Sequence, residues 1–185
     1  MKTTEERSDW KRFLATGSSG EVLARIVEGD PLHVTERVAE RLEKRCLILD
    51  AERVALGTLA RVARLAPHYR GRPEFPVWLR ERTDEAIDDL LRREETEEET
   101  DQDGAHAVLA RPLGLDPVRA REACRAFHRC SDFERACFFS LVFRARSLDE
   151  AAEELSGAPT EIARAARRVL DQLMRPEVRE PEELP

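Results

Sequence analysis

Apolar residues recur along this chain at intervals of three and four, and no stretch alternates apolar and polar residues with a period of two. The first spacing gathers side chains on one face of an α-helix, whereas a half-buried strand requires the second. Ala, Leu, Arg and Glu, which are strong helix formers, dominate the segments between Pro and Gly. The pattern therefore predicts an all-α fold.

The composition allows a folded protein with a modest core. The chain has 185 residues, of which 41% are hydrophobic and 37% are charged, and its formal net charge is −7. This hydrophobic fraction excludes wholesale disorder. No run approaches the roughly 18 apolar residues of a membrane-spanning helix, and the N-terminal segment lacks the apolar core of a secretory signal. We therefore expect no membrane segment and a cytoplasmic protein with reduced cysteines.

A charge run divides the chain into two helical domains. Residues 94–103 carry seven acids and no base, and Pro112, Gly114 and Pro117 follow them. Such a block repels itself and stays solvated, so it predicts a linker. The expected organisation is a helical domain over 1–95, an acidic linker with Pro and Gly over 96–115, a second helical domain over 116–175 and a disordered tail over 176–185.

Capping residues, Pro and Gly set the expected helix boundaries. In the first domain the helices cover 10–15, 21–28, a segment from 31, a segment from 50, where an Asp is a suitable N-cap, and 74–95. In the second domain they cover 116–129, 132–145, 148–155 and 160–174. The last two are joined by a short turn that contains Gly157, which is typical of a helix-turn-helix.

Two separate blocks of the sequence resemble conserved regions of a known family. The first block reads D-A-E at 50–52, Y-R-G-R-P-E-F-P-V-W-L at 69–79 and A-I-D-D-L-L-R-R at 86–93. The second reads S-L-D-E-A-A-E-E-L at 147–155 and continues into the next helix. In this order and spacing the blocks resemble bacterial RNA polymerase sigma factors of the sigma-70 family, extracytoplasmic-function type. The resemblance implies a sigma region 2-like helical bundle followed by a region 4-like helix-turn-helix.

The resemblance also implies partners and roles. The implied partners are core RNA polymerase and promoter DNA, with an anti-sigma factor as a further candidate. The polymerase-binding residues would be Asp50, Glu52 and Arg53. The −10 promoter element would be gripped by Arg70, Arg72 and Arg82. The −35 element would be read by the helix at 160–174, through Thr160, Arg164, Arg167 and Arg168.

Elementary chemistry supports some of these candidates more than others. Single-strand binding uses cations for the backbone and aromatic faces for stacking, and Tyr69, Phe75 and Trp78 lie among arginines. Phe75 and Trp78 share an apolar helical stripe, so we expect them in the core and expect function from the loop residues Arg70 and Arg72. For the arginines of the helix at 160–174, the alternative to DNA contact is a solvated helix face.

The sequence also departs from the family at the implied interfaces. Leu56 and Gly57 stand where the family has polar residues that face polymerase, and residues 80–99 hold four bases against ten acids. Such a surface repels phosphate unless the acids point elsewhere. The alternative hypothesis is therefore a degenerate sigma-like regulator that acts by protein–protein contacts and binds DNA weakly or not at all.

No arrangement of residues favours catalysis or a cofactor. A zinc site could be formed by Cys124, His128, Cys130 and Cys137. Their spacing, however, matches no standard structural zinc finger, and neighbouring cysteines on helices are more often small buried side chains. A glycine-rich phosphate loop and the common hydrolase motifs are missing from the sequence. We therefore expect no metal, no cofactor and no enzymatic activity, with an all-helical enzyme as the third and weakest hypothesis.

Overall fold

The computed structural model describes residues 16–27, 32–96 and 105–175. All regular structure in these ranges is helical, which confirms the all-α prediction for this part of the chain. The helix expected at 10–15, the core of the acidic run at 97–104 and the tail at 176–185 lie outside the described residues.

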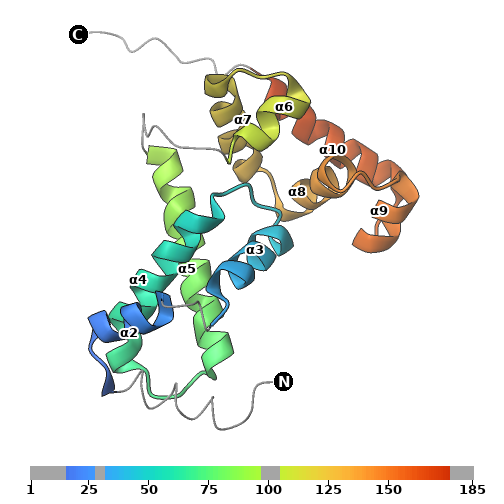
Figure 1. The fold of residues 1–185 in the computed structure, drawn as a ribbon. Coiled ribbons are helices and arrows are strands. Elements are labelled where there is room, and N and C mark those ends of the chain that lie inside the picture. The colour runs from blue at the N-terminus through green and yellow to red at the C-terminus, as the bar shows by residue number, and fades with distance from the viewer. Residues whose placement is uncertain (1–15, 28–31, 97–104, 176–185) are drawn as a thin grey trace, which may run out of the picture. The chain divides into compact units, whose positions relative to one another are not determined.

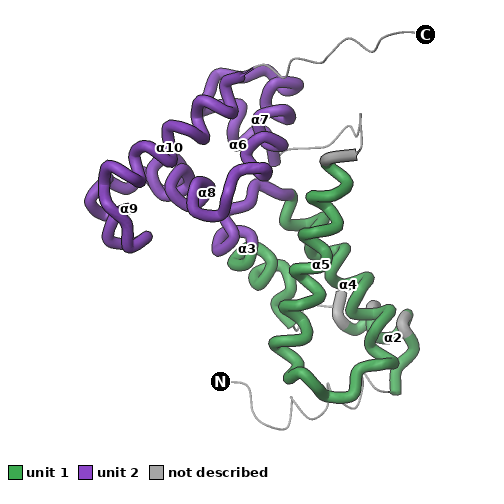
Figure 2. The backbone as a smooth tube through the Cα atoms, turned by 180° about the vertical axis from the view of Figure 1, so that it is seen from behind, with its two compact units in different colours: residues 1–41, 50–98 green, residues 42–49, 99–185 purple. Residues whose placement is uncertain are grey.

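The chain divides into two compact units, coloured separately in Figure 2. Unit 1 comprises residues 1–41 and 50–98, and unit 2 comprises residues 42–49 and 99–185. The chain thus passes from one unit to the other at 41/42, 49/50 and 98/99. Residues 42–49 were expected in the first domain, but their contacts place them with the second.

Unit 1 is built around two long helices. Its elements are α2 (Ser19–Val27), the larger part of α3 (Val34–Lys44), α4 (Ala51–Leu65), the 3-10 turn η1 (Ala66–His68) and α5 (Phe75–Thr96), shown in Figure 1. Helix α4 packs along α5 and also against α2. The apolar residues that recur at helical spacing form the core, and its fully or nearly fully buried members include Val22, Val38, Val54, Val62, Leu79 and Ile87.

Two ion pairs fasten the helices of unit 1. Arg41 of α3 binds Asp84 of α5 through Nε at 2.6 Å and Nη2 at 2.8 Å, a bidentate arrangement that suits a planar guanidinium. Arg61 of α4 pairs with Asp89 of α5. Two acids of the strongly charged helix α5, Asp84 and Asp89, therefore form ion pairs with arginines of unit 1.

Unit 2 is an assembly of shorter helices. Its elements are α6 (Ala107–Leu113), α7 (Pro117–Arg129), α8 (Asp132–Phe138), the π-helical turn η2 (Phe139–Phe143), α9 (Leu148–Leu155) and α10 (Pro159–Met174). Helix α10 packs against α8, α7 and α9. Asp116, Ser131 and Ser147 cap α7, α8 and α9, the last two through capping boxes with Glu134 and Glu150. These S-x-x-E pairs satisfy backbone donors at both helix starts.

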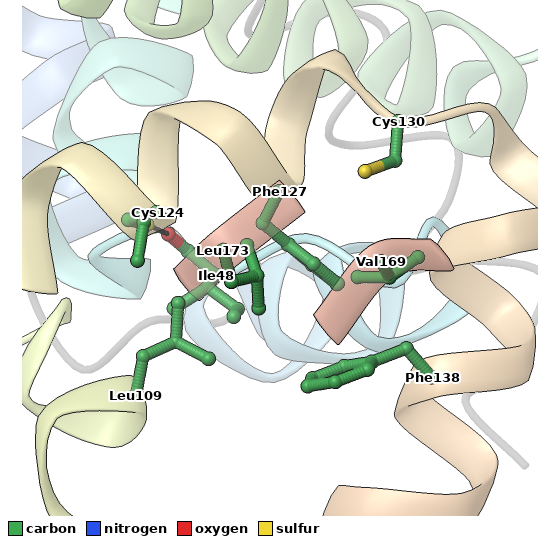
Figure 3. Close-up of a cluster of buried hydrophobic side chains, with 9 residues drawn as sticks. Ile48, Leu109, Cys124, Phe127, Cys130, Phe138, Val169 and Leu173 are labelled. Carbon is green, nitrogen blue, oxygen red and sulfur yellow. Dashed lines mark hydrogen bonds between the residues drawn. The ribbon is translucent and has the colours of Figure 1, made fainter. Parts of the chain in front are cut away.

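The main core of unit 2 includes a residue from the segment 42–49. Ile48 is 6% exposed and packs with Leu109, Phe127, Phe138, Val169 and Leu173, as Figure 3 shows. A second cluster, around Cys137, Ala151 and Ile162, lies beneath α9 and α10. Burial of the apolar side chain of Ile48 explains why the segment 42–49 belongs to this unit.

Two sequence expectations for this region need correction. The linker was expected to reach residue 115, but α6 occupies most of its second half and Leu109 of α6 is fully buried. Gly114 ends this short helix in the left-handed C-cap conformation with φ 63°, Pro112 lies inside the helix, and Pro117 opens α7. The helix expected over 132–145 is α-helical only to Phe138 and continues as the π-helical turn η2.

Candidate nucleic-acid interface

Helices α9 and α10 are joined by the three residues 156–158. Ser156 takes the left-handed conformation with φ 52° and ends α9, and Gly157 donates its backbone N–H to the carbonyl of Ala152 at 3.1 Å. Pro159 then opens α10, a position where its missing N–H is no loss. The expected pair of helices at 148–155 and 160–174 is confirmed to within one residue.

Helix α10 has two distinct faces. Its buried side consists of Ile162, Ala165, Ala166, Val169 and Leu173, which pack on the rest of unit 2. On the opposite side the candidate DNA-binding residues Thr160, Arg164, Arg167 and Arg168 are all exposed. Their spacing of three and four residues aligns them along one stripe of the helix. The structure thus brings these four predicted residues together on an accessible surface.

One arginine of this stripe has a partner in unit 2. Arg168 Nε donates to Glu134 Oε1 of α8 at 2.9 Å. Glu134 also accepts from the Ser131 hydroxyl at 2.8 Å through Oε2. These hydrogen bonds, that of Arg168 first, hold the pKa of Glu134 below its ordinary value. Sequence reasoning missed Glu134, although its S-x-x-E capping signature was visible.

Arg164 and Arg167 differ from Arg168. Within the described residues the structure gives neither side chain an ion pair or a side-chain hydrogen bond. Acids are also present on this helix, namely Glu161 in its first turn and Asp171 further along. A pair of exposed guanidinium groups, each a planar fork of donors, suits contact with phosphate or with a guanine edge.

The loop between α4 and α5 carries the other two strong candidates. Arg70 and Arg72 are exposed on either side of Gly71, whose φ of 79° favours glycine. Arg70 Nη1 donates to the Pro67 carbonyl at 3.0 Å. Figure 1 shows this loop at one end of unit 1, beyond the C-terminus of α4.

The aromatic residues beneath the loop are packed together. Trp78 and Tyr69 are 6% and 5% exposed, and their ring centroids lie 4.8 Å apart. Phe75 is half-buried, and its ring centroid lies 5.9 Å from that of Trp78 and 6.1 Å from that of Tyr69. The core assignment is therefore correct for Trp78 and holds in part for Phe75.

The structure places Arg82 differently from the loop arginines. Its side chain is 18% exposed, pairs with Glu85 at 2.8 Å and Glu81 at 3.5 Å, and lies 5.8 Å from the centroid of the Trp78 ring. Ion pairing and packing on the ring therefore occupy this guanidinium within α5. Arg82 is therefore engaged by side chains of α5, whereas Arg70 and Arg72 are exposed in the loop.

The three predicted polymerase-binding residues lie at the start of α4. Asp50 is the N-cap, and its Oδ1 accepts the backbone N–H groups of Glu52 at 2.8 Å and Arg53 at 3.2 Å. Asp50 thus has a structural role. Glu52 is exposed and Arg53 is half-buried, while Leu56, one turn later, is 59% exposed. An apolar side chain therefore stands on the surface that the resemblance assigns to polymerase.

The cysteine and histidine residues that invited a zinc interpretation have other contacts. Cys124 Sγ donates to the carbonyl of Ile48 at 3.4 Å, and His128 Nε2 accepts the N–H of Ile48 at 3.2 Å. Cys130 Sγ donates to Gln172 Oε1 at 2.8 Å. All four cysteines are buried and form no disulfide, and the described residues contain no cluster of metal-ligating groups.

No protein-family model matches the chain, and neither a curated protein nor a solved structure matches it at a significant level. The sigma-factor resemblance therefore rests on the two sequence blocks themselves. In the part of the chain that the structure describes, no helix has the length and apolar character needed to cross a membrane.

Proposed function

We propose that this chain is a sigma-like transcription initiation factor that binds core RNA polymerase and promoter DNA in the cytoplasm. The observation that carries the proposal is the exposed stripe of Thr160, Arg164 and Arg167 on α10, the second helix of the α9–α10 pair. A helix in this position of a helix-turn-helix inserts into the major groove. In this role α10 reads the −35 element, and the loop with Arg70 and Arg72 contacts the −10 element.

Two experiments test this function. The first is a pull-down of core polymerase by the full chain at low salt, followed by run-off transcription, in which association and promoter-dependent transcripts are expected. The second measures affinity for double-stranded promoter DNA as salt is raised. Replacing Arg164 and Arg167 by Ala should weaken the logarithmic salt slope by about 1.8, because each lost phosphate contact accounts for about 0.9.

The DNA-binding assay needs a control variant that loses an exposed arginine elsewhere in unit 2. Arg111, an exposed arginine of α6, is the control, and Arg111→Ala should leave affinity and slope unchanged. Failure of correctly folded protein to bind either polymerase or DNA would remove the proposal.

A second function follows from the surface of α4. Leu56 is 59% exposed and Ala60, one turn later on the same face, is also exposed. Exposed apolar residues at helical spacing favour a protein contact over a contact with phosphate. The alternative is therefore a sigma-like regulator that binds polymerase or an anti-sigma factor and has little affinity for DNA. Binding to polymerase that is lost in Leu56→Asp, together with no DNA binding at any salt concentration, would favour it.

A further inference from the structure

We infer that unit 1 holds a single nucleic-acid strand by its phosphates alone, through Arg70 and Arg72, and does not stack its bases. The inference rests on the proposed function, because it specifies how the loop between α4 and α5 recognises the strand that it contacts. It predicts that this contact is independent of base sequence.

The aromatic rings beside the loop are already engaged. Base stacking requires an open ring face, but Tyr69 and Trp78 are 5% and 6% exposed and pack against each other at 4.8 Å between centroids. The Tyr69 hydroxyl donates to the Pro73 carbonyl at 2.8 Å, which fixes this ring under the loop. Neither ring is available to a base without opening the core.

Phe75 is the third ring of this group. Its side chain is half-buried, and its ring centroid lies 6.1 Å from that of Tyr69 and 5.9 Å from that of Trp78. Packing on these two buried rings positions Phe75 as part of the apolar cluster that supports the loop. Phe75 is half-buried, whereas Tyr69 and Trp78 are buried, so a variant at this position is the sharpest probe of stacking.

The charge around the loop suits a phosphate backbone. Residues 64–80 contain four arginines, Arg64, Arg70, Arg72 and Arg80, all exposed, against one acid, Glu74, which gives a net charge of +3. Residues 81–94 reverse this sign, with six acids against three arginines, or −3. Phosphates are therefore attracted to the loop end of unit 1 and repelled along the rest of α5.

The loop geometry separates the two main cations. Gly71, at φ 79°, turns the chain between them, and the hydrogen bond of Arg70 to the Pro67 carbonyl is made through Nη1, so among the described residues its other guanidinium donors remain open to an anion. Each guanidinium offers a planar set of donors that matches phosphate oxygens. The same groups carry no information about base identity when they contact the backbone.

The test compares two strands that differ only in their bases. Full-length protein is titrated into a fluorescein-labelled oligothymidylate of about twelve nucleotides and into an abasic strand of the same length, with fluorescence anisotropy as the readout. The two Kd values should agree within about twofold. The variant R70A/R72A should weaken both equally and lower the logarithmic salt slope by about 1.4, since single strands release about 0.7 counterion per contact.

Two variants refine the test. Phe75→Leu keeps an apolar side chain but removes the ring, and it should leave both Kd values unchanged. Arg111→Ala in unit 2 is the matched control for loss of one exposed arginine and should also have no effect.

Each contrary result has a distinct meaning. A Kd at least about tenfold weaker for the abasic strand, or a loss in Phe75→Leu that is confined to the thymidylate strand, would show stacking and overturn this inference alone. R70A/R72A with unchanged affinity would also overturn it. Absence of binding to both strands, together with no association with polymerase, would overturn the proposed function.

Discussion

His128 accepts a hydrogen bond from the backbone N–H of Ile48 through Nε2 at 3.2 Å, although 80 residues separate the two in the sequence. One turn earlier in α7, Cys124 donates its thiol to the carbonyl of the same residue at 3.4 Å. Both main-chain groups of Ile48 are thus bound by side chains at positions i and i+4 of one helix. This arrangement satisfies buried backbone groups that lie outside any regular element.

Ile48→Ala should destabilise unit 2, even though residue 48 lies between two helices of unit 1 in the sequence. The side chain is 6% exposed, and its removal leaves a cavity beside Leu109 and Phe127. We expect a loss of about 2–4 kcal/mol in the free energy of unfolding. Hydrogen exchange followed by mass spectrometry should locate the loss of protection in α7 and α10. The control Leu56→Ala, at a site 59% exposed, should change stability by less than about 0.5 kcal/mol.

Glu134→Gln should weaken both the start of α8 and the contact with α10. The substitution removes the negative charge and replaces one of the two carboxylate oxygens, which accept from Arg168 at 2.9 Å and from Ser131 at 2.8 Å, with an amide NH2 group that cannot accept. We expect a loss of about 1 kcal/mol at neutral pH in urea denaturation. An unchanged midpoint, with unchanged cooperativity, would contradict this role.

The stabilisation by Glu134 should also depend on pH. The folded-state pKa of Glu134 is lowered from 4.5, first by the Arg168 hydrogen bond, so its contribution is fully present above 4.5 and is lost as the pH falls through the lowered value. The difference in stability between wild type and Glu134→Gln should therefore shrink in acid. Urea denaturation curves of both proteins, recorded at several pH values from neutral to acidic, measure this stability difference. A difference that grows as the pH falls would contradict the assignment.

The cysteine thiols should resist reagents in the folded protein. Burial raises the pKa of Cys46 and Cys130, and it raises the pKa of Cys137 to about 11. At pH 8 only about one Cys137 in a thousand is then a thiolate, which is the reactive form. A colorimetric disulfide reagent should titrate almost no thiol in native protein and four in denatured protein. Rapid reaction of one thiol in the native state would contradict this.

Gly71→Ala should strain the loop that carries Arg70 and Arg72. No atom of the described residues lies within 4 Å of a Cβ placed there, so the expected cost is that of the left-handed backbone at φ 79°, about 1–2 kcal/mol. Gly71→Asn should cost less, because Asn tolerates this conformation better. Gly157→Ala is the control: a Cβ there meets Ile162 at ordinary contact distance and φ is not positive. Thermal denaturation of the three variants measures their loss of stability relative to wild type.

The sequence alone determined the helical class and most helix positions, because these depend on local spacing and caps. The stripe on α5, the N-cap at Asp50 and the α9–turn–α10 pair were all predicted from neighbouring residues, as was burial of Trp78. Exposure of Arg164 and Arg167 followed from the same helical periodicity.

Only the tertiary structure decided which residues that are distant in the sequence contact each other. Burial of Ile48 assigns the segment 42–49 to unit 2, and burial of Leu109 packs α6, which occupies part of the expected linker, against the core of unit 2. Glu134 forms an ion pair with Arg168, and Glu85 forms one with Arg82, so two of the predicted DNA contacts have intramolecular ion-pair partners. Helical periodicity selects the face on which a side chain lies, but the residue opposite that face is set by how the helices pack.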